Sequence, residues 1–238
     1  MQNSRKESKR WLKKISMIKK EASAITGGLS RPGKMPGPSY NLPASMCQTG
    51  QKLVRVPGTV CPGCYALKGS YRFPNVQAAL KRRLRSLDHG SWTTAMVRLV
   101  TGVKHFRWHD SGDLQSAQHL TNIFEVCKAT PETMHWLPTR EAKLLALMDP
   151  DVVPKNLVVR VSGTKVNGPA PSWWPWTSTV TTIRYTIKKL LYFFFRIKPI
   201  LKDGSWLCPS KLPLGPAKCR SCRACWTHDV RNITYGKH

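Results

Sequence analysis

The chain has 238 residues, of which 41% are hydrophobic, and this is typical of one globular domain or of one domain with a short appendage. Its 39 lysines and arginines against 12 acidic residues give a formal net charge of +27. Such a charge favours polyanions, so DNA, RNA or a nucleotide is the expected partner, with a solvated basic surface as the alternative. The composition argues against a disordered or fibrous chain.

No targeting or membrane segment is expected. Residues 1–28 lack the continuous apolar core of a secretory signal. The most apolar run, residues 190–195, is too short to cross a bilayer. We therefore expect a cytoplasmic protein, in which the eight cysteines act as metal ligands or redox groups rather than as disulfides.

The amino-terminal residues 1–28 predict an appended basic amphipathic helix. Trp11, Leu12, Ile15 and Ile18 fall on one helical face among many lysines, and Gly27-Gly28 end the pattern. Residues 29–60 are rich in Gly, Pro and Ser and are expected to be mostly loop.

From residue 74 onward, helical and strand patterns alternate. Helices are expected behind Pro74 and over 91–101, 114–129 and 139–148, with Ser91 as the N-cap of the second. Strands are expected over 103–110, 133–138 and 156–163. This alternation predicts an α/β fold with a parallel, partial (βα) barrel-like sheet and Cys-rich metal-binding loops. Residues 29–238 would form this single metal-binding domain, with 173–206 as a candidate insertion and 207–238 as a Cys-rich segment.

Polar residues follow each expected strand. They are His109, Asp110 and Asp113 after the first, Thr139, Arg140 and Glu141 after the second, and Arg160 and Ser162 in the third. Ligands of parallel α/β sheets bind outside the carboxyl ends of the strands, so these side chains predict a substrate rim. Helix-cap and turn roles are the alternative, since Asp and Ser suit helix starts. Arg140 and Arg160 would bind a carboxylate or phosphate, and Asp113 would bind a ribose hydroxyl or act as acid or base.

Four cysteines near the carboxyl end, Cys208, Cys219, Cys222 and Cys225, form the group that we call the second cysteine group. A C-x2-C-x2-C run matches the start of a ferredoxin-type motif, and Cys208 supplies a fourth thiolate. Zinc prefers paired knuckles, so an iron–sulfur cluster is the favoured interpretation, with zinc or no metal as the alternatives. Neighbouring cations would balance the thiolate charge or contact phosphate; they are Lys218, Arg220 and Arg223.

Three cysteines, Cys47, Cys61 and Cys64, form the first cysteine group. Three protein ligands leave one position open, for a substrate or cofactor on a [4Fe–4S] cluster or for water on a catalytic zinc. His89, His105 or a cysteine of the second group could close the site instead. The eighth cysteine, Cys127, lies on an apolar helix face and is expected in the core.

Five blocks of sequence resemble the gene product 88 proteins of phage and prophage genomes. In chain order they are CPGCYALKGSYRFPNVQAALKRRLRSL, FRWHDSGDLQSAQHL, HWLPTRE, NLVVRVSG and the ending CRSCRACW…VRNITYGKH. The resemblance covers residues 35–172 and 206–238, and residues 1–28 and 181–206 depart from it. It implies a phage-encoded protein in the interior of the host cell.

The layout is also similar to that of radical S-adenosylmethionine enzymes, which carry a three-cysteine [4Fe–4S] cluster after the first strand of a partial barrel. The knuckle CPGCYA and Asp113 fit this similarity. The candidate cofactor-binding residues are Tyr65, Arg160 and Ser162. The spacing between Cys47 and Cys61 departs from the short run of that superfamily.

Two functional hypotheses arise from these patterns. The first is an iron–sulfur enzyme with one or two [4Fe–4S] clusters, acting on a nucleotide or nucleic-acid substrate with S-adenosylmethionine as cofactor. Its catalytic residues would be His109, Asp110, Asp113, Arg140 and Glu141. The second is a non-catalytic nucleic-acid-binding protein stabilised by zinc.

Overall fold

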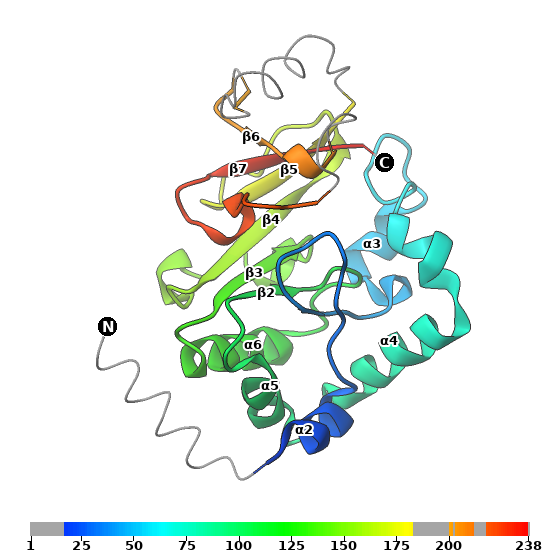
Figure 1. The fold of residues 1–238 in the computed structure, drawn as a ribbon. Helices are drawn as coiled ribbons and strands as arrows, with labels where there is room; N and C mark the ends of the chain where they lie inside the picture. Colours follow the sequence, from blue (N-terminus) through cyan, green and yellow to red (C-terminus); the bar gives the residue numbers. More distant parts are fainter. Residues whose placement is uncertain (1–16, 183–199, 202, 212–217, 238) are drawn as a thin grey trace.

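The fold is α/β in the computed structural model, which describes residues 17–182, 200–201, 203–211 and 218–237 (Figure 1). Its α-helices are α2 (Lys19–Thr26), α3 (Gln48–Leu53), α4 (Pro74–Ser86), α5 (Trp92–Val100) and α6 (Ala117–Ala129). Its strands are β1 (Ser39–Tyr40), β2 (His105–Trp108), β3 (Met134–Thr139), β4 (Leu157–Val166), β5 (Thr177–Thr181), β6 (Trp206–Leu207) and β7 (Asn232–Gly236).

The strands form one seven-stranded sheet in the order β1-β2-β3-β4-β5-β7-β6, and all neighbouring pairs are parallel. This confirms the predicted α/β class and the parallel sheet. The sheet is open, with β1 and β6 as its edges, so the barrel-like shape is not confirmed. Because all strands point the same way, the segments that come after them meet at one edge of the sheet.

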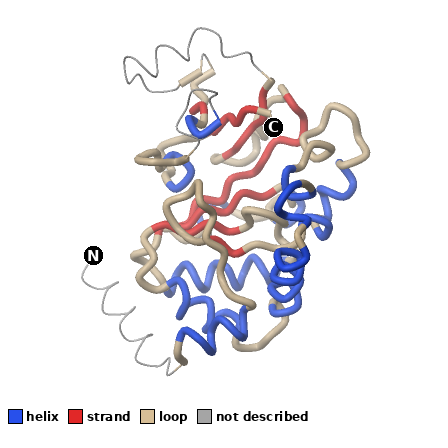
Figure 2. The backbone as a smooth tube through the Cα atoms, turned by 45° about the vertical axis from the view of Figure 1, so that its right-hand side comes forward, coloured by secondary structure: helices blue, strands red, loops and turns tan. Residues whose placement is uncertain are grey.

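The two faces of the sheet carry different cores because successive side chains of a strand point to opposite sides. One face packs against α5 and α6, and its buried side chains include Phe106, Leu137 and Val159. Figure 1 shows these two helices beneath the sheet, and Figure 2 shows the longer helices together on one side of the strands. The other face carries Trp136 and Ile233, which pack against the Cys-rich carboxyl-terminal segment.

Three of the predicted helices are present, with shifted bounds. Helix α4 begins at Pro74, where a missing N–H costs nothing. Ser91 occupies the N-cap of α5 without a side-chain capping bond, whereas the Ser116 hydroxyl accepts the His119 N–H at the start of α6. Cys127 is fully buried on α6, as predicted.

The predicted helix over 139–148 is wrong. Strand β3 continues to Thr139, and only a 3-10 turn over Ala142–Leu144 comes after it. Glu141 has ψ 61°, outside the helical region, and its carboxylate accepts the N–H and the hydroxyl of Thr49 in α3. Tertiary hydrogen bonds override the helical propensity here.

The predicted amino-terminal helix lies partly outside the described residues, because residues 1–16 are not among them. In the described part, α2 ends at Gly27, which adopts the left-handed conformation at φ 76°, and the helix packs against α5. Strand β1 lies within the range expected to be loop. Residues 177–181 of the candidate insertion form β5 inside the sheet, and 183–199 lie outside the described residues. No helix of the described residues is both long and apolar enough for a membrane span.

Candidate functional site

The first cysteine group comes together in space although Cys47 lies fourteen residues before Cys61. Cys47 precedes α3, and a Cβ atom placed on Gly50 would lie 3.8 Å from the Cys47 Sγ and 4.0 Å from the Cys61 Sγ. Cys64 closes a turn in which its N–H donates to the Cys61 carbonyl at 3.0 Å. Charges on the thiols of Cys47 and Cys61 would both interact with a charge on Cys64.

This group lies at the carboxyl edge of the sheet. The N–H of Val60, next to Cys61, donates to the carbonyl of Thr164 near the end of β4 at 3.0 Å. The thiols also interact electrostatically with Asp113 and Arg140, which come after β2 and β3. The group therefore occupies the place where ligands of parallel sheets bind.

Asp113 connects the segments after β2 and β3. Its Oδ1 accepts the Thr139 hydroxyl at 2.6 Å and the Leu114 N–H at 2.8 Å, and its Oδ2 accepts the Arg140 N–H at 2.8 Å. Burial raises the pKa of Asp113 to about 6, although these hydrogen bonds favour the ionised carboxylate. The two strand ends predicted to meet thus share one buried carboxyl group.

Glu141 connects the end of β3 to α3. Its Oε1 accepts the Thr49 N–H at 2.9 Å, and its Oε2 accepts the Thr49 hydroxyl at 2.6 Å. Since Thr49 lies two residues after Cys47, this pair of bonds fixes the cysteine-bearing turn against the sheet.

The surroundings of the first group are acidic. Burial raises the pKa of the Cys47 and Cys61 thiols, and the carboxylates of Asp113 and Glu141 raise it further, while Arg140 lowers it. Three thiols and two carboxyl groups around one guanidinium would favour a bound cationic centre. In the described part of the chain, no three His, Cys, Asp or Glu side chains are arranged as a ready-made metal ligand set.

His109, directly after β2, has an unusual backbone and an unusual environment. Its φ is 57°, which is strained for a residue with a ring and is a feature of functional sites. Among the described residues, neither ring nitrogen has a hydrogen-bond partner, and the ring centroid is 5.3 Å from that of His119. Burial, together with His119 and Arg107, lowers the pKa of His109 well below its ordinary value, so the ring is neutral.

The two histidines considered as a fourth ligand contact other parts of the chain. His89 accepts the Ser91 N–H on its Nδ1 at 3.1 Å, at the turn before α5. The ring of His105 lies 5.6 Å from that of Trp226, beside the second cysteine group. Neither contact involves the first group.

The second cysteine group lies over the opposite face of the sheet from α5 and α6. Cys208 comes directly after β6, and its N–H donates to the Thr234 carbonyl of β7 at 2.9 Å. The Cys222 N–H donates to the Cys219 carbonyl at 2.8 Å, the same turn that joins Cys61 and Cys64. The Cys225 Sγ lies 3.3 Å from the hydroxyl oxygen of Tyr235.

Cations surround the second group. Burial raises the pKa of Cys219 and raises that of Cys225 to about 12, and negative charge on Cys208 raises both further. Arg107 and Arg223 lower the pKa of Cys219, and Arg160 lowers that of Cys225. The guanidinium groups therefore offset part of the cost of ionising these thiols.

Arg160 holds the Cys-rich segment rather than a ligand. Its side chain is fully buried in β4, and its guanidinium donates to six backbone carbonyls. They belong to Thr177, Ala224, Cys225, Thr227, Val230 and Arg231. All of its donors face protein, so the predicted role in binding a cofactor, carboxylate or phosphate does not fit this geometry. Ser162, also in β4, is buried, and its Oγ accepts the Ser178 hydroxyl at 3.0 Å.

Asp110 and Arg107 connect the neighbourhoods of the two cysteine groups. Tyr65, next to Cys64, donates its hydroxyl to the backbone carbonyl of Asp110, and Tyr71 donates to Asp110 Oδ2 at 2.5 Å. Arg107 donates to Asp110 Oδ1 at 2.7 Å, and its guanidinium carbon lies 4.3 Å from the centroid of the Trp136 ring. The Trp136 face also carries the second group, so this partly buried ion pair contacts the surroundings of both groups.

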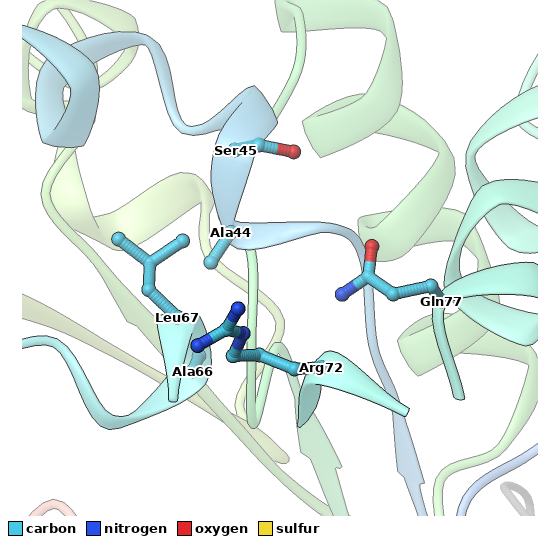
Figure 3. A pocket seen from close by; sticks show the side chains of 6 residues that line it. All are labelled: Ala44, Ser45, Ala66, Leu67, Arg72 and Gln77. Carbon is cyan, nitrogen blue, oxygen red and sulfur yellow. The ribbon is translucent and has the colours of Figure 1, made fainter. Parts of the chain in front are cut away.

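A pocket of about 300 Å³ lies beside the first group. It is lined by Ala44, Ser45, Ala66, Leu67, Arg72 and Gln77 (Figure 3). Two of its walls adjoin cysteines in the chain. The 3-10 turn Ala44–Met46 is followed by Cys47, and the 3-10 turn Tyr65–Leu67 is preceded by Cys64. The side chains of Arg72 and Gln77 reach into the space between these walls.

Three residues of this region were not expected from the sequence: Arg107, Tyr71 and His119. Arg107 gave a usable signal, since a cation in the middle of the short apolar strand HFRW must find a buried partner. Tyr71 and His119 gave none, because a tyrosine in a glycine-rich turn and a histidine on an apolar helix face are ordinary.

The raised pKa of Asp113 predicts a pH dependence that Asp113→Asn removes. The folded state binds this proton more tightly, so the contribution of Asp113 to stability falls as pH rises from about 4 to about 6, while the buried histidines contribute in the opposite direction in both proteins. The loss is up to about 3 kcal/mol for a shift of this size. Urea unfolding of both proteins between pH 4 and pH 7 measures this loss. As pH rises across this range, the free energy of unfolding of Asp113→Asn should increase relative to that of the natural chain. Parallel pH profiles would contradict the assignment.

The gene product 88 family profile matches residues 4–228, so it includes residues 4–28 and 181–206, which we expected to depart from the family, and it ends ten residues before the expected limit. No curated protein and no solved structure matches the chain. The profile match spans the two cysteine groups, the strand-end residues and most of the sheet. The chain therefore belongs to the gene product 88 family.

Proposed function

We propose that this phage-family protein is an iron–sulfur protein with two separate cysteine sites. The observation that supports this most strongly is the sorting of seven cysteines into two places of different character. The first group lies at the carboxyl edge among carboxylates, and the second lies on a sheet face among arginines. The seven cysteines of the two groups are free thiols in the described residues and could therefore act as ligands.

The second group is the closed site of this proposal. Four thiolates would hold one [4Fe–4S] cluster, and three of them come from the two turns of C-x2-C-x2-C. Arg107, Arg160 and Arg223 would offset the negative charge of the thiolates and tune the reduction potential. The firm attachment of this segment through Arg160 suits a structural or electron-carrying role.

The first group is the reactive site of this proposal. Three thiolates would hold a cluster with one iron open, and the open position would face a pocket that offers Arg72 and Gln77. Arg140 lies on the same edge, where its cation would meet a nucleotide or nucleic-acid substrate, and the buried Asp113 carboxyl holds the Arg140 backbone in place. The cofactor of this proposal is S-adenosylmethionine, to which such a cluster supplies one electron.

A product assay tests the enzymatic part. The chain, reconstituted anaerobically with iron and sulfide and reduced with dithionite, should convert S-adenosylmethionine to 5′-deoxyadenosine and methionine. Cys64→Ala should abolish this, because it removes one of only three ligands, whereas Cys127→Ala in the core should keep it. An intact, reducible cluster that leaves the cofactor uncleaved would rule out this chemistry.

A zinc-stabilised nucleic-acid-binding protein is the second candidate. It is favoured by the two matching turns, in which Cys64 donates to Cys61 and Cys222 donates to Cys219, since C-x2-C turns of this kind also form zinc knuckles. This alternative predicts a colourless protein with stoichiometric zinc and a binding constant for nucleic acid that falls steeply with salt.

A further inference from the structure

The segment that houses the first cysteine group contains no acidic residue. Between Glu21 and Asp88, residues 22–87 include ten lysines and arginines and no aspartate or glutamate. This acid-free segment contributes α3, α4 and the turns around Cys47, Cys61 and Cys64. The charged side chains that this segment itself contributes are therefore all cationic, in contrast to the carboxylates of Asp113 and Glu141 near the thiols.

The exposed cations continue from the pocket along one side of α4. Gln77 lines the pocket, and Lys81 and Arg85 come after it at intervals of four residues, so the three lie on one helix face. The face spans about 12 Å along the helix. Lys81 and Arg85 are exposed, as are Lys68 and Arg72 at the pocket end. We call the surface made by Lys68, Arg72, Gln77, Lys81 and Arg85 the α4 rim.

Apolar side chains are exposed beside these cations. Phe73, directly before α4, is 57% exposed, and Leu67 in the pocket wall is 38% exposed. Met46, between the pocket and Cys47, is 46% exposed. An exposed aromatic ring beside an exposed arginine is the combination on which unpaired bases stack. A duplex keeps its bases stacked inside, so this combination favours a single strand.

The pocket has the chemistry of a base site. Alanine and leucine side chains form its walls, and the Gln77 amide and the Arg72 guanidinium reach into it (Figure 3). Gln77 donates its Nε2 to the Tyr71 carbonyl at 2.6 Å, which orients the amide. Apolar walls with few polar groups suit a nucleobase, and the turns that form these walls adjoin Cys47 and Cys64 in the chain.

We propose that the α4 rim binds single-stranded nucleic acid, with phosphates on Arg72, Lys81 and Arg85 and one base in the pocket beside the first cysteine group. Phe73 stacks on a neighbouring base. This deepens the proposed function at the same site, because it names the substrate class as a single strand, but the binding itself needs no cluster.

Fluorescence anisotropy with a labelled twelve-nucleotide oligo-dT and the full chain tests this. The double variant Lys81→Ala/Arg85→Ala should weaken binding about tenfold or more and lower the slope of log Kd against log salt by about 1.4, because it removes two phosphate contacts. Phe73→Leu keeps the apolar volume but loses the ring, and should weaken binding about tenfold with little change in slope.

A matched control removes two exposed cations elsewhere. Lys104 and Lys155 precede β2 and β4, at the opposite edge of the sheet, so Lys104→Ala/Lys155→Ala makes the same charge change and should leave the slope as it was. The proposal would be overturned if the two double variants weakened oligo-dT binding equally, or if the natural chain bound a duplex of the same length as tightly as it binds the single strand. Iron content of the same samples separates the two proposals. If the protein contains zinc and binds the oligonucleotide through the α4 rim, only the iron–sulfur function is contradicted. If it contains iron and does not bind the oligonucleotide, only the proposed binding by the α4 rim is contradicted.

Discussion

Replacing Arg160 with methionine is expected to lower the free energy of unfolding by at least about 3 kcal/mol. Methionine fills most of the volume, but the six carbonyls that the guanidinium holds lose a charged donor in a buried place. Five of these carbonyls lie in residues 224–231, so the loss should loosen the Cys-rich segment first. Urea unfolding followed by tryptophan fluorescence measures the change.

Two further variants make this result specific. Arg160→Lys keeps the charge but offers three donors from one nitrogen, so it should recover only a minor part of the lost stability. Arg231→Met makes the same substitution at an exposed arginine of the same segment and should cost less than about 0.5 kcal/mol. If Arg160→Met were as stable as Arg231→Met, the six hydrogen bonds would not anchor the segment.

Much of the candidate site could be predicted from the spacing of the cysteines and from the direction of the strands. The strand-end residues Asp113, Arg140 and Glu141 meet because parallel strands bring the segments after them to one edge of the sheet. Cys61 and Cys64 are close in space because C-x2-C closes a turn, whereas Cys47 is placed beside them by the bonds between Thr49 and Glu141. The turn and the strand ends depend on local geometry or on strand direction, and both can be read from one sequence.

The sequence could not reveal contacts with partners that are distant in the chain. Arg160 looked like a ligand-binding cation because the strand NLVVRVSG is apolar around it, yet most of its carbonyl partners lie more than sixty residues later. The segment 139–148 had a helical pattern that Glu141 interrupts with a non-helical backbone, while its carboxylate accepts hydrogen bonds from the distant Thr49. Strands β1 and β6 have two residues each, too few to show a pattern.

Removing one cysteine from each group is expected to remove metal from that group alone. Cys61→Ala deletes a ligand at the carboxyl edge, and Cys222→Ala deletes one in the second group, over the face of the sheet. Because the two groups have separate neighbours, loss of one cluster should leave the other in place. Cys127→Ala changes a buried cysteine of the core outside both groups and should keep the full metal content.

The metal content of anaerobically purified protein tests the central claim most directly. Iron, acid-labile sulfide and zinc are measured per chain in the natural sequence and in Cys61→Ala, Cys222→Ala and Cys127→Ala. Two [4Fe–4S] clusters predict about eight iron atoms with equal sulfide, about four in each ligand variant, and about eight in the core variant. Stoichiometric zinc without iron, no metal at all, or loss of all iron in either ligand variant would contradict two separate iron–sulfur sites.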